Sequence, residues 1–263
     1  MIIMNRFVNA KRIVIKIGTT TLTHGGGLLN YRRMEHLIKT IADLKNSGKE
    51  IVLVSSGAIG VGMGELGLKV RPSDVPTRQA CAAVGQCELM YTYDKMFGEY
   101  NHPVAQILLT RDVVEQQERK QNVINTFERL LEFGVIPIVN ENDAVSTEEI
   151  FGDNDTLSAI VATLINADLL ILLSDIDGLY TANPKEDPTA ELIPVVEDIA
   201  SVRHLAGGSS SSFGTGGMVT KLNAAEIACS VGIDMAILNG ASPELMYDLF
   251  DGKEIGTYFV GRK

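Results

Sequence analysis

Short apolar segments alternate with longer segments of mixed polarity along most of the chain. Two of the apolar segments, residues 51–54 and 169–173, carry no polar side chain, which is typical of strands that helices cover on both faces. In the longer segments, apolar residues recur every three or four positions, as they do in amphipathic helices. This alternation predicts an α/β fold, a three-layer αβα sandwich with a central, mainly parallel sheet.

The pattern also gives the order of the elements. Strands are expected at residues 12–17, 51–55, 104–109, 135–139, 169–173, 235–238 and 257–260. Helices are expected at residues 31–47, 77–100, 119–133, 155–166 and 218–231. No repeat or tail stands apart, so we expect one domain over residues 1–263. The serine run Ser209–Ser212 indicates a loop that either closes over a site or has no fixed structure.

The composition is that of an ordinary globular protein. With 263 residues and 45% hydrophobic content, the chain can bury a sizeable core. Its formal net charge of −10 argues against nucleic acid and anionic membrane as partners, because binding a polyanion needs a surplus of Lys and Arg. The longest apolar stretch is interrupted by Asn166 and Asp168, so it predicts no membrane span.

The cysteines and histidines indicate neither disulfides nor a metal site. Cys81, Cys87 and Cys229 are an odd number without a CxxC pair, as expected for thiols in a reducing cytosol. The four histidines are scattered and have no metal-ligand spacing. Basic residues interrupt the apolar opening segment, which is therefore a poor signal peptide. We expect a cytoplasmic protein with no metal ion held by its own side chains.

Polar residues follow the predicted strands, at the sheet edge where open α/β proteins bind their ligands. Lys16 lies near the end of the first strand, just before Gly18. A lysine among apolar residues is costly unless it meets an anion or lies at an exposed edge. The second strand leads into Ser56 at a strand–turn–helix junction that suits a carboxylate or a phosphate, although a plain helix cap would use the same residue types.

Later strands end in dense acidic and amide side chains. Residues 140–143 follow one strand, and residues 153–155 come shortly afterwards. Such groups can bind an ammonium, fix a metal or orient lysines, but capping and turn formation use them too. After the next strand, Ser174 and Asp175 begin a polar segment that could meet a purine and a ribose.

The segment from Gly214 to Lys221 is the most informative one in the chain. Three glycines and two hydroxyl residues lead into a lysine at the start of a predicted helix, so N–H groups and an ammonium can face a phosphate. A surface loop with a solvated lysine is the alternative. The GxGxxG pattern at residues 62–67 does not indicate a dinucleotide site, because it lies well past the strand end and lacks the acidic residue that should follow.

Taken together and in this order, these segments resemble the amino acid kinase family. The resemblance is carried by residues 14–19, 55–58, 140–145, 152–155, 174–180 and 214–221, and so covers essentially the whole chain. Residues 140–145 and 214–218 favour the branch that phosphorylates free glutamate over those acting on acetylglutamate, aspartate, carbamate or uridylate. The resemblance implies direct transfer of the γ-phosphoryl group of ATP to the γ-carboxylate of L-glutamate, the first step of proline synthesis.

The resemblance also implies roles for individual residues. Lys16 and Lys221 would stabilise the transferring phosphoryl group, while Asp155 would hold both ammonium groups. The residues implied to bind glutamate are Ser56, Asp143 and Asn154, with Asn140 and Asp153 as helpers. The residues implied to contact ATP are Lys16, Gly18, Ser174, Asp175, Thr215, Gly216, Gly217, Met218, Val219, Thr220 and Lys221.

The same resemblance implies a division of labour and a set of partners. Residues up to about 165 would bind glutamate and the remainder would bind ATP, with Mg²⁺ carried mainly by the nucleotide. We expect a homo-oligomer, inhibition by proline at the glutamate site, and none of the added C-terminal domain, similar to RNA-modification modules, that many members of the branch carry.

Three other functions stay open at this point. The chain could phosphorylate a different amino acid, could sense a nucleotide or an amino acid without turnover, or could be a structural assembly subunit. The presence of both lysines and of Asp155 argues against a protein that has lost turnover.

Overall fold

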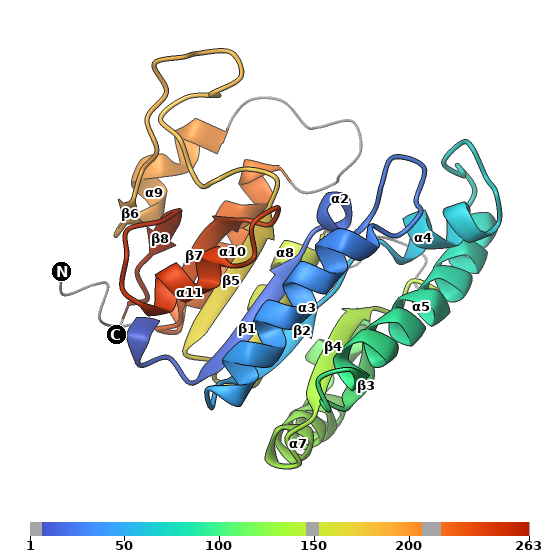
Figure 1. Cartoon of the computed structure of the whole chain (residues 1–263). Coiled ribbons are helices and arrows are strands. Elements are labelled where there is room, and N and C mark those ends of the chain that lie inside the picture. The colour runs from blue at the N-terminus through green and yellow to red at the C-terminus, as the bar shows by residue number, and fades with distance from the viewer. Residues whose placement is uncertain (1–6, 146–152, 207–216, 263) are drawn as a thin grey trace.

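The computed structural model describes residues 7–145, 153–206 and 217–262, and its centre is one eight-stranded sheet (Figure 1). The strands lie in the order β3-β4-β2-β1-β5-β7-β8-β6. All neighbours are parallel except β7 and β8. The strands are β1 (Arg12–Ile17), β2 (Glu50–Val54), β3 (Val104–Leu109), β4 (Ile136–Glu141), β5 (Leu169–Ser174), β6 (Val195–Val196), β7 (Asp234–Asn239) and β8 (Thr257–Phe259).

Helices pack on both faces of this sheet, so the predicted αβα sandwich is confirmed (Figure 1). The predicted strands and long helices are present, with ends displaced by about two residues or fewer. The short elements α2, α6, β6, α9 and α11 were not predicted. The helices are α2 (Thr19–Leu22), α3 (Tyr31–Asn46), α4 (Ala58–Glu65), α5 (Val75–Gly98), α6 (Arg111–Glu115), α7 (Gln117–Glu132), α8 (Asn154–Leu164), α9 (Ile199–Val202), α10 (Met218–Ser230) and α11 (Leu245–Phe250), with a 3₁₀ turn at Arg203–Ala206.

The alternation of side chains along β1 divides the core in two. Ile13, Ile15 and Ile17 pack with α3, α5 and α11 on one face, while Val14 packs with α7, α8 and α10 on the other. Lys16 shares its face with Val14 because the two lie two residues apart. The two-residue period of the strand therefore fixes the face on which Lys16 lies, and its side chain must contact side chains of α8 and α10.

Side-chain caps fix where the helices begin. Asn30, Asp74 and Asp153 accept hydrogen bonds from backbone N–H groups three residues later, at the starts of α3, α5 and α8. Asp168, which interrupts the longest apolar stretch of the sequence, accepts the N–H groups of Lys11 and Arg12 at 2.8 Å each and so ties the loop before β5 to the start of β1.

Glycines let α4 and α5 cross with their backbones in contact. A Cβ atom on Gly62 would lie 1.8 Å from the carbonyl oxygen of Cys81, and one on Gly85 would lie 1.9 Å from that of Ala58. The first glycine of the GxGxxG pattern at residues 62–67, Gly62, thus serves helix packing, in agreement with the rejection of the pattern as a dinucleotide site. Because α4 begins at the strand–turn–helix junction after β2, this crossing also fixes the junction.

Replacing Gly85 with Ala should destabilise the protein by roughly 1–3 kcal/mol, because the new methyl group overlaps the backbone of α4. Gly98→Ala is the matched control at the end of the same helix, where a Cβ meets no atom within 4 Å. Urea unfolding should give a lower midpoint for Gly85→Ala and an unchanged or higher one for Gly98→Ala. Equal midpoints for the two variants would contradict the close crossing.

Candidate active site

Two lysines from distant parts of the chain converge on one carboxylate. Lys16 Nζ at the end of β1 lies 2.5 Å from Asp155 Oδ1, and Lys221 Nζ in the first turns of α10 lies 3.0 Å from Asp155 Oδ2. Asp155 itself lies in the first turn of α8. The exposed-edge alternative for Lys16 is wrong, because β1 is a central strand and the residue is 8% exposed.

Burial makes this cluster electrostatically strong. The side chain of Asp155 is 1% exposed, and those of Lys16 and Lys221 are 10% and 6% exposed. Burial by itself would raise the pKa of Asp155, but the charges of Lys16 and Lys221 outweigh it and lower the pKa to about 2. Two ammonium groups and one carboxylate leave a positive charge in a poorly solvated place, and this favours an anionic ligand there.

The start of α10 adds N–H donors beside this cluster. Its N-cap is Gly217, which offers no side-chain acceptor, so the first N–H groups of the helix are not capped by that residue. Thr220 Oγ1 lies 3.0 Å from Asp155 Oδ2 and 2.7 Å from the carbonyl oxygen of Gly217. Met218 and Val219 lie in the same turn, whereas Thr215, Gly216 and the serine run lie outside the described residues.

A chain of amide hydrogen bonds holds the residue next to Asp155. Asn154 Nδ2 donates to the carbonyl oxygen of Ser55 at 2.7 Å and to Asn140 Oδ1 at 3.1 Å. Asn140 Nδ2 in turn donates to Gln86 Oε1 on α5 at 2.9 Å. Asn140 was expected to follow its strand, but it is part of β4, which runs on to Glu141. Its side chain is thereby held by the sheet.

Ser56 and Gly18 lie at the ends of the adjacent central strands β1 and β2. The hydroxyl of Ser56 donates to the carbonyl oxygen of Ile17 at 2.6 Å, so Ser56 can accept a further hydrogen bond but not donate a second. The next residue, Gly57, has a φ of 88°, which favours glycine and turns the chain into α4. Gly18 is the extended residue that precedes α2.

Asp153 has one carboxylate oxygen to spare. Its Oδ1 accepts the N–H of Thr156 and caps α8, while its Oδ2 is buried and has no hydrogen-bond partner within the described ranges. A buried carboxylate oxygen without a partner is costly, so a ligand donor is expected there.

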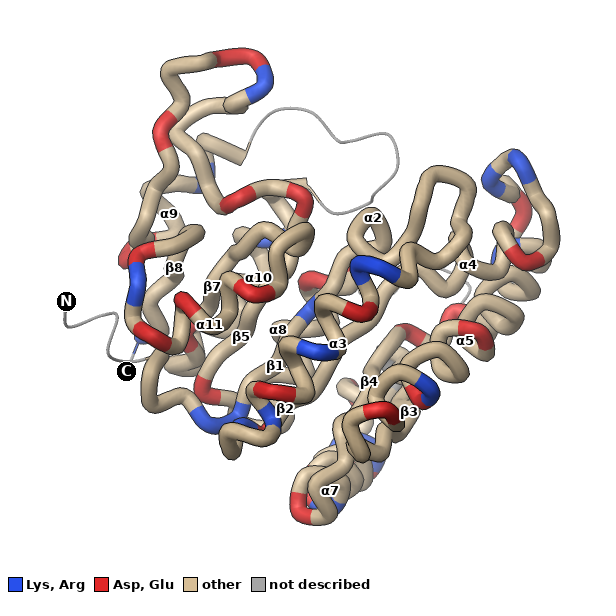
Figure 2. Tube along the Cα trace, in the orientation of Figure 1, with Lys and Arg blue, Asp and Glu red and all other residues tan. Residues whose placement is uncertain are grey.

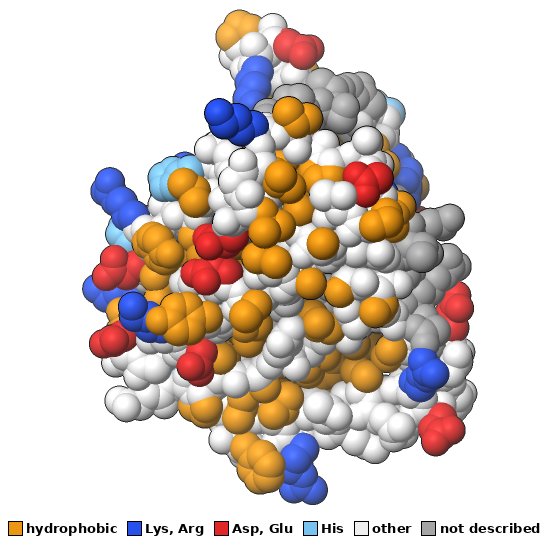
Figure 3. Space-filling model, turned by 90° about the vertical axis from the view of Figure 1, so that its right-hand side faces the viewer, with side chains coloured by type: hydrophobic (Ala, Val, Ile, Leu, Met, Phe, Trp, Pro, Cys, Tyr) orange, Lys and Arg blue, Asp and Glu red, His pale blue; other side chains and the backbone are white. Residues whose placement is uncertain are grey.

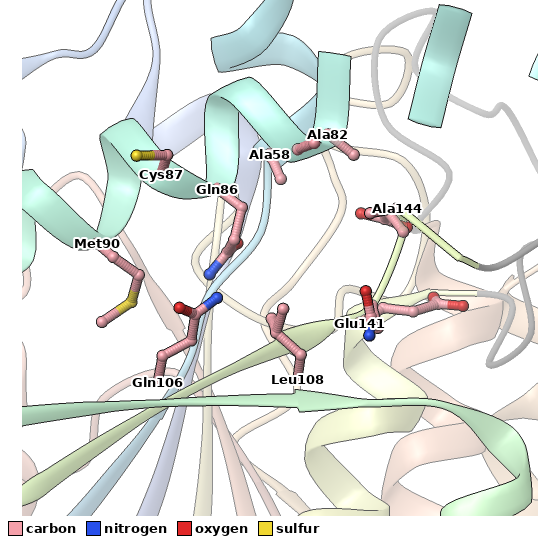
Figure 4. A pocket seen from close by; sticks show the side chains of 12 residues that line it. Ala58, Ala82, Gln86, Cys87, Met90, Gln106, Leu108, Glu141 and Ala144 are labelled. Atoms are coloured by element: carbon pink, nitrogen blue, oxygen red, sulfur yellow. The ribbon is translucent and has the colours of Figure 1, made fainter. Parts of the chain in front are cut away.

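A cavity of about 320 Å³ opens beside these residues, between α5 and the ends of β3 and β4 (Figure 4). Asp143, in the turn after β4, is part of its wall. Acidic and amide groups thus face the same space as apolar ones. The lining residues are Ala58, Ala82, Ala83, Gln86, Cys87, Met90, Gln106, Leu108, Glu141, Asn142, Asp143 and Ala144.

A second polar group lies at the ends of β5 and β7. Ser174, the last residue of β5, donates to the carboxylate of Asp175 at 3.2 Å. Asp177 accepts hydrogen bonds from Asn239 at 2.7 Å and from Tyr180 at 3.0 Å. These residues flank the cluster on the side of α10, away from the cavity.

Gln86 and Asn239 were not predicted from the sequence as members of these groups. Gln86 lies within a helical pattern and Asn239 at the end of an apolar strand, so neither has a local signal. Each joins the site only through the packing of its element against another, which a single sequence does not reveal.

The sequence profile of the amino acid kinase family matches residues 11–239. The chain belongs to the amino acid kinase family. It is 56% identical to a glutamate 5-kinase of Clostridium perfringens, covering 97% of both chains, and 52% identical to one of Listeria monocytogenes, covering 97% of this chain and 95% of the other. The family resemblance inferred from the sequence is confirmed.

Solved structures of the same fold are more distant. A UMP kinase from Bacillus anthracis superposes with a TM-score of 0.69 at 17% identity, over 97% of each chain. An isopentenyl phosphate kinase from T. acidophilum gives 0.65 at 17% identity, over 95% of this chain and all of the other. At such identities the likeness concerns the fold alone.

The described residues contain neither a cluster of metal ligands nor a membrane-spanning helix. No group of three or more His, Cys, Asp or Glu side chains there could hold a metal ion. No helix in those ranges is both long and apolar enough to cross a membrane. Among the described residues, basic and acidic positions are interspersed along the trace (Figure 2).

Replacing Asp155 with Asn should destabilise the protein by roughly 3–5 kcal/mol near neutral pH, because both buried ammonium groups lose their counter-charge. The lowered pKa means that the carboxylate stabilises the fold above pH about 4 and stops doing so as the pH falls to about 2. The difference in unfolding free energy between the two proteins should therefore shrink by about 2 kcal/mol over that range. Urea titrations at a series of pH values measure it, and a difference independent of pH would contradict the ion cluster.

Proposed function

We propose that the chain transfers the γ-phosphoryl group of ATP to the γ-carboxylate of L-glutamate, giving γ-glutamyl phosphate. The observation that carries the proposal is the cluster of Lys16, Asp155 and Lys221, a buried site with surplus positive charge. The glutamate 5-kinases to which the chain is 56% and 52% identical support the choice of substrate.

Phosphoryl transfer to a carboxylate needs alignment and charge neutralisation more than proton transfer. The acceptor is already ionised near neutral pH, so no general base is required. The ammonium groups of Lys16 and Lys221 stabilise the negative charge that spreads over the phosphoryl oxygens. Asp155 keeps both ammonium groups at fixed positions. A fixed carboxylate also prevents the two like charges from moving apart.

The nucleotide half of the site comprises α10 and the ends of β1 and β5. The N–H groups at the start of α10 and at Gly18 face phosphate oxygens, and Ser174 and Asp175 contact the nucleoside. ATP, when bound, supplies the phosphoryl group and brings Mg²⁺. Phosphate oxygens of the nucleotide would carry most of the Mg²⁺ coordination.

The amino-acid half comprises the cavity and the start of α8. Asp143, in the cavity wall, accepts the α-ammonium group of glutamate, and the spare oxygen of Asp153 adds to the negative surroundings. Ser56 and Asn154 also contact glutamate; because the hydroxyl of Ser56 and the Nδ2 group of Asn154 already donate within the protein, both present acceptor oxygens to the ligand. Asn140 holds Asn154 in place. We place the division between the two halves near residue 165, within a single domain.

Three further features are part of the same proposal. Proline inhibits by occupying the glutamate site. The protein acts in the cytoplasm, in keeping with cysteines that form no disulfide in the described structure. Copies of the chain associate with one another. Exposed apolar side chains on α5 support this, among them Val84 and Tyr91, which are 38% and 61% exposed. Figure 3 shows apolar groups gathered on the side of the molecule where α5 lies.

The experiment that tests the function is trapping of the acyl phosphate with hydroxylamine while the offered amino acid is varied. Glutamate should give the hydroxamate, whereas acetylglutamate and aspartate should not, because an acyl group removes the charge that Asp143 binds and a shorter chain cannot span the site. Consumption of ATP that does not depend on any amino acid would refute the proposal.

Lys16→Ala and Lys221→Ala should each lower kcat by roughly a hundredfold or more, since each removes one fixed charge from the transferring group. Lys11→Ala is the control: it removes an exposed lysine at the other end of β1, where it pairs with Glu50. Hydroxamate formation by folded, purified variants measures the effect. Near-normal turnover in either active-site variant would count against these roles.

Asp143→Ala should raise the KM for glutamate far more than the KM for ATP, because the residue contacts only the amino-acid head. Initial rates with each substrate varied in turn give the two constants. Equal increases in both would rule out Asp143 as the ammonium partner.

A further inference from the structure

The orientation of the amide groups beside the cavity follows from two backbone groups. Asn140 Oδ1 accepts the backbone N–H of Glu141 at 3.0 Å, and a backbone N–H can only donate. Asn154 Nδ2 lies 2.7 Å from the carbonyl oxygen of Ser55, which can only accept. Both facts agree with the bond from Asn154 Nδ2 to Asn140 Oδ1, so neither amide can be turned over.

The assignment of donor and acceptor atoms in Asn140 also determines that of Gln86. Because Asn140 Oδ1 faces Glu141 and Asn154, its Nδ2 must face Gln86, and Gln86 must present its oxygen, at 2.9 Å. The Nε2 group of Gln86 therefore points away from Asn140. Figure 4 shows this amide directed into the cavity from α5, toward Gln106 on β3. Gln86 is 8% exposed, so its amide is a largely buried donor.

The other cavity walls show what this donor can meet. Glu141 and Asp143 supply carboxylates, and Met90 and Leu108 supply apolar surface. A ligand group next to Gln86 Nε2 must accept a hydrogen bond, while one next to the two acids must donate. An α-amino-acid head has a carboxylate and an ammonium on one carbon, and so satisfies both walls at once.

We propose that Gln86 selects the substrate by donating an Nε2–H hydrogen bond to its α-carboxylate, while its Oε1 positions Asn140. The inference rests on the function proposed above and adds a specificity-determining residue to it. Gln86 belongs to α5, and the close crossing of α5 with α4 fixes the position of Gln86 relative to the cavity.

A second residue of α5 fixes the other end of the same hydrogen-bond chain. Tyr93, two helical turns after Gln86, shares a hydrogen bond of 3.0 Å with the hydroxyl of Ser55, whose carbonyl oxygen holds Asn154. Asn154 is thus supported through Asn140 from Gln86 and through Ser55 from Tyr93. Both supports come from one face of one helix, so the Nε2 donor of Gln86 and the amide of Asn154 keep a fixed position relative to each other.

The test uses Gln86→Glu, which keeps an oxygen for Asn140 and replaces the donor with a charge that repels a carboxylate. L-glutamate is compared with 4-aminobutyrate, which has the same γ-carboxylate and ammonium group but no α-carboxylate. We expect kcat/KM for glutamate to fall at least tenfold, with the KM for ATP unchanged. For 4-aminobutyrate, kcat/KM should change less than threefold. Where its turnover is too slow to measure, its Ki as an inhibitor against glutamate is compared instead and should also change less than threefold.

Gln106→Glu is the matched control, because it adds the same charge to the same cavity from β3, and it should give a smaller loss with glutamate. If Gln86→Glu lowers kcat/KM equally for glutamate and 4-aminobutyrate, the role of Gln86 is merely structural and the inference is overturned. Equal losses of kcat/KM for glutamate in Gln86→Glu and Gln106→Glu would also overturn it, as would no loss in Gln86→Glu. Wild-type protein that forms no hydroxamate from glutamate would overturn the proposed function instead, so the two failures are distinguishable.

Discussion

A single buried carboxylate between two ammonium groups governs the arrangement of this protein. Asp155 is almost inaccessible to water, and without Lys16 and Lys221 its charge would be strongly disfavoured. The converse also holds, because two buried lysines repel each other unless an anion lies between them. The ends of β1, α8 and α10 must therefore meet, although the residues concerned are separated by 139 and 66 positions in the chain.

The parallel sheet makes this meeting possible. Parallel strands place their carboxyl ends on one edge, and the central pair β1 and β5 brings the first and second halves of the chain together there. The strand period then turns Lys16 toward α8 and α10 instead of toward α3. Packing on the opposite face, where α4 and α5 touch through glycines, determines the shape of the cavity beside this edge.

Much of this architecture could be predicted from the sequence, because its signals are local. Wholly apolar runs such as residues 169–173 indicate buried parallel strands, and polar residues directly after them mark the binding edge. Short elements such as α9 and α11 were missed because four or six residues carry too little periodicity. Gln86 was missed for another reason: its importance depends on the direction of an amide that only contacts with Asn140 can define.

In the proposed mechanism, the start of α8 serves both halves of the site. Asp153 is the N-cap of α8, and Asn154 and Asp155 are its first two residues, which point about 100° apart, so the start of one helix can face the amino-acid side and the phosphoryl side simultaneously. A ligand that displaces this turn from either side must alter affinity on the other, and thermodynamic linkage makes the two effects equal in size. The proposed site therefore implies that the binding of the two substrates is coupled through three adjacent residues.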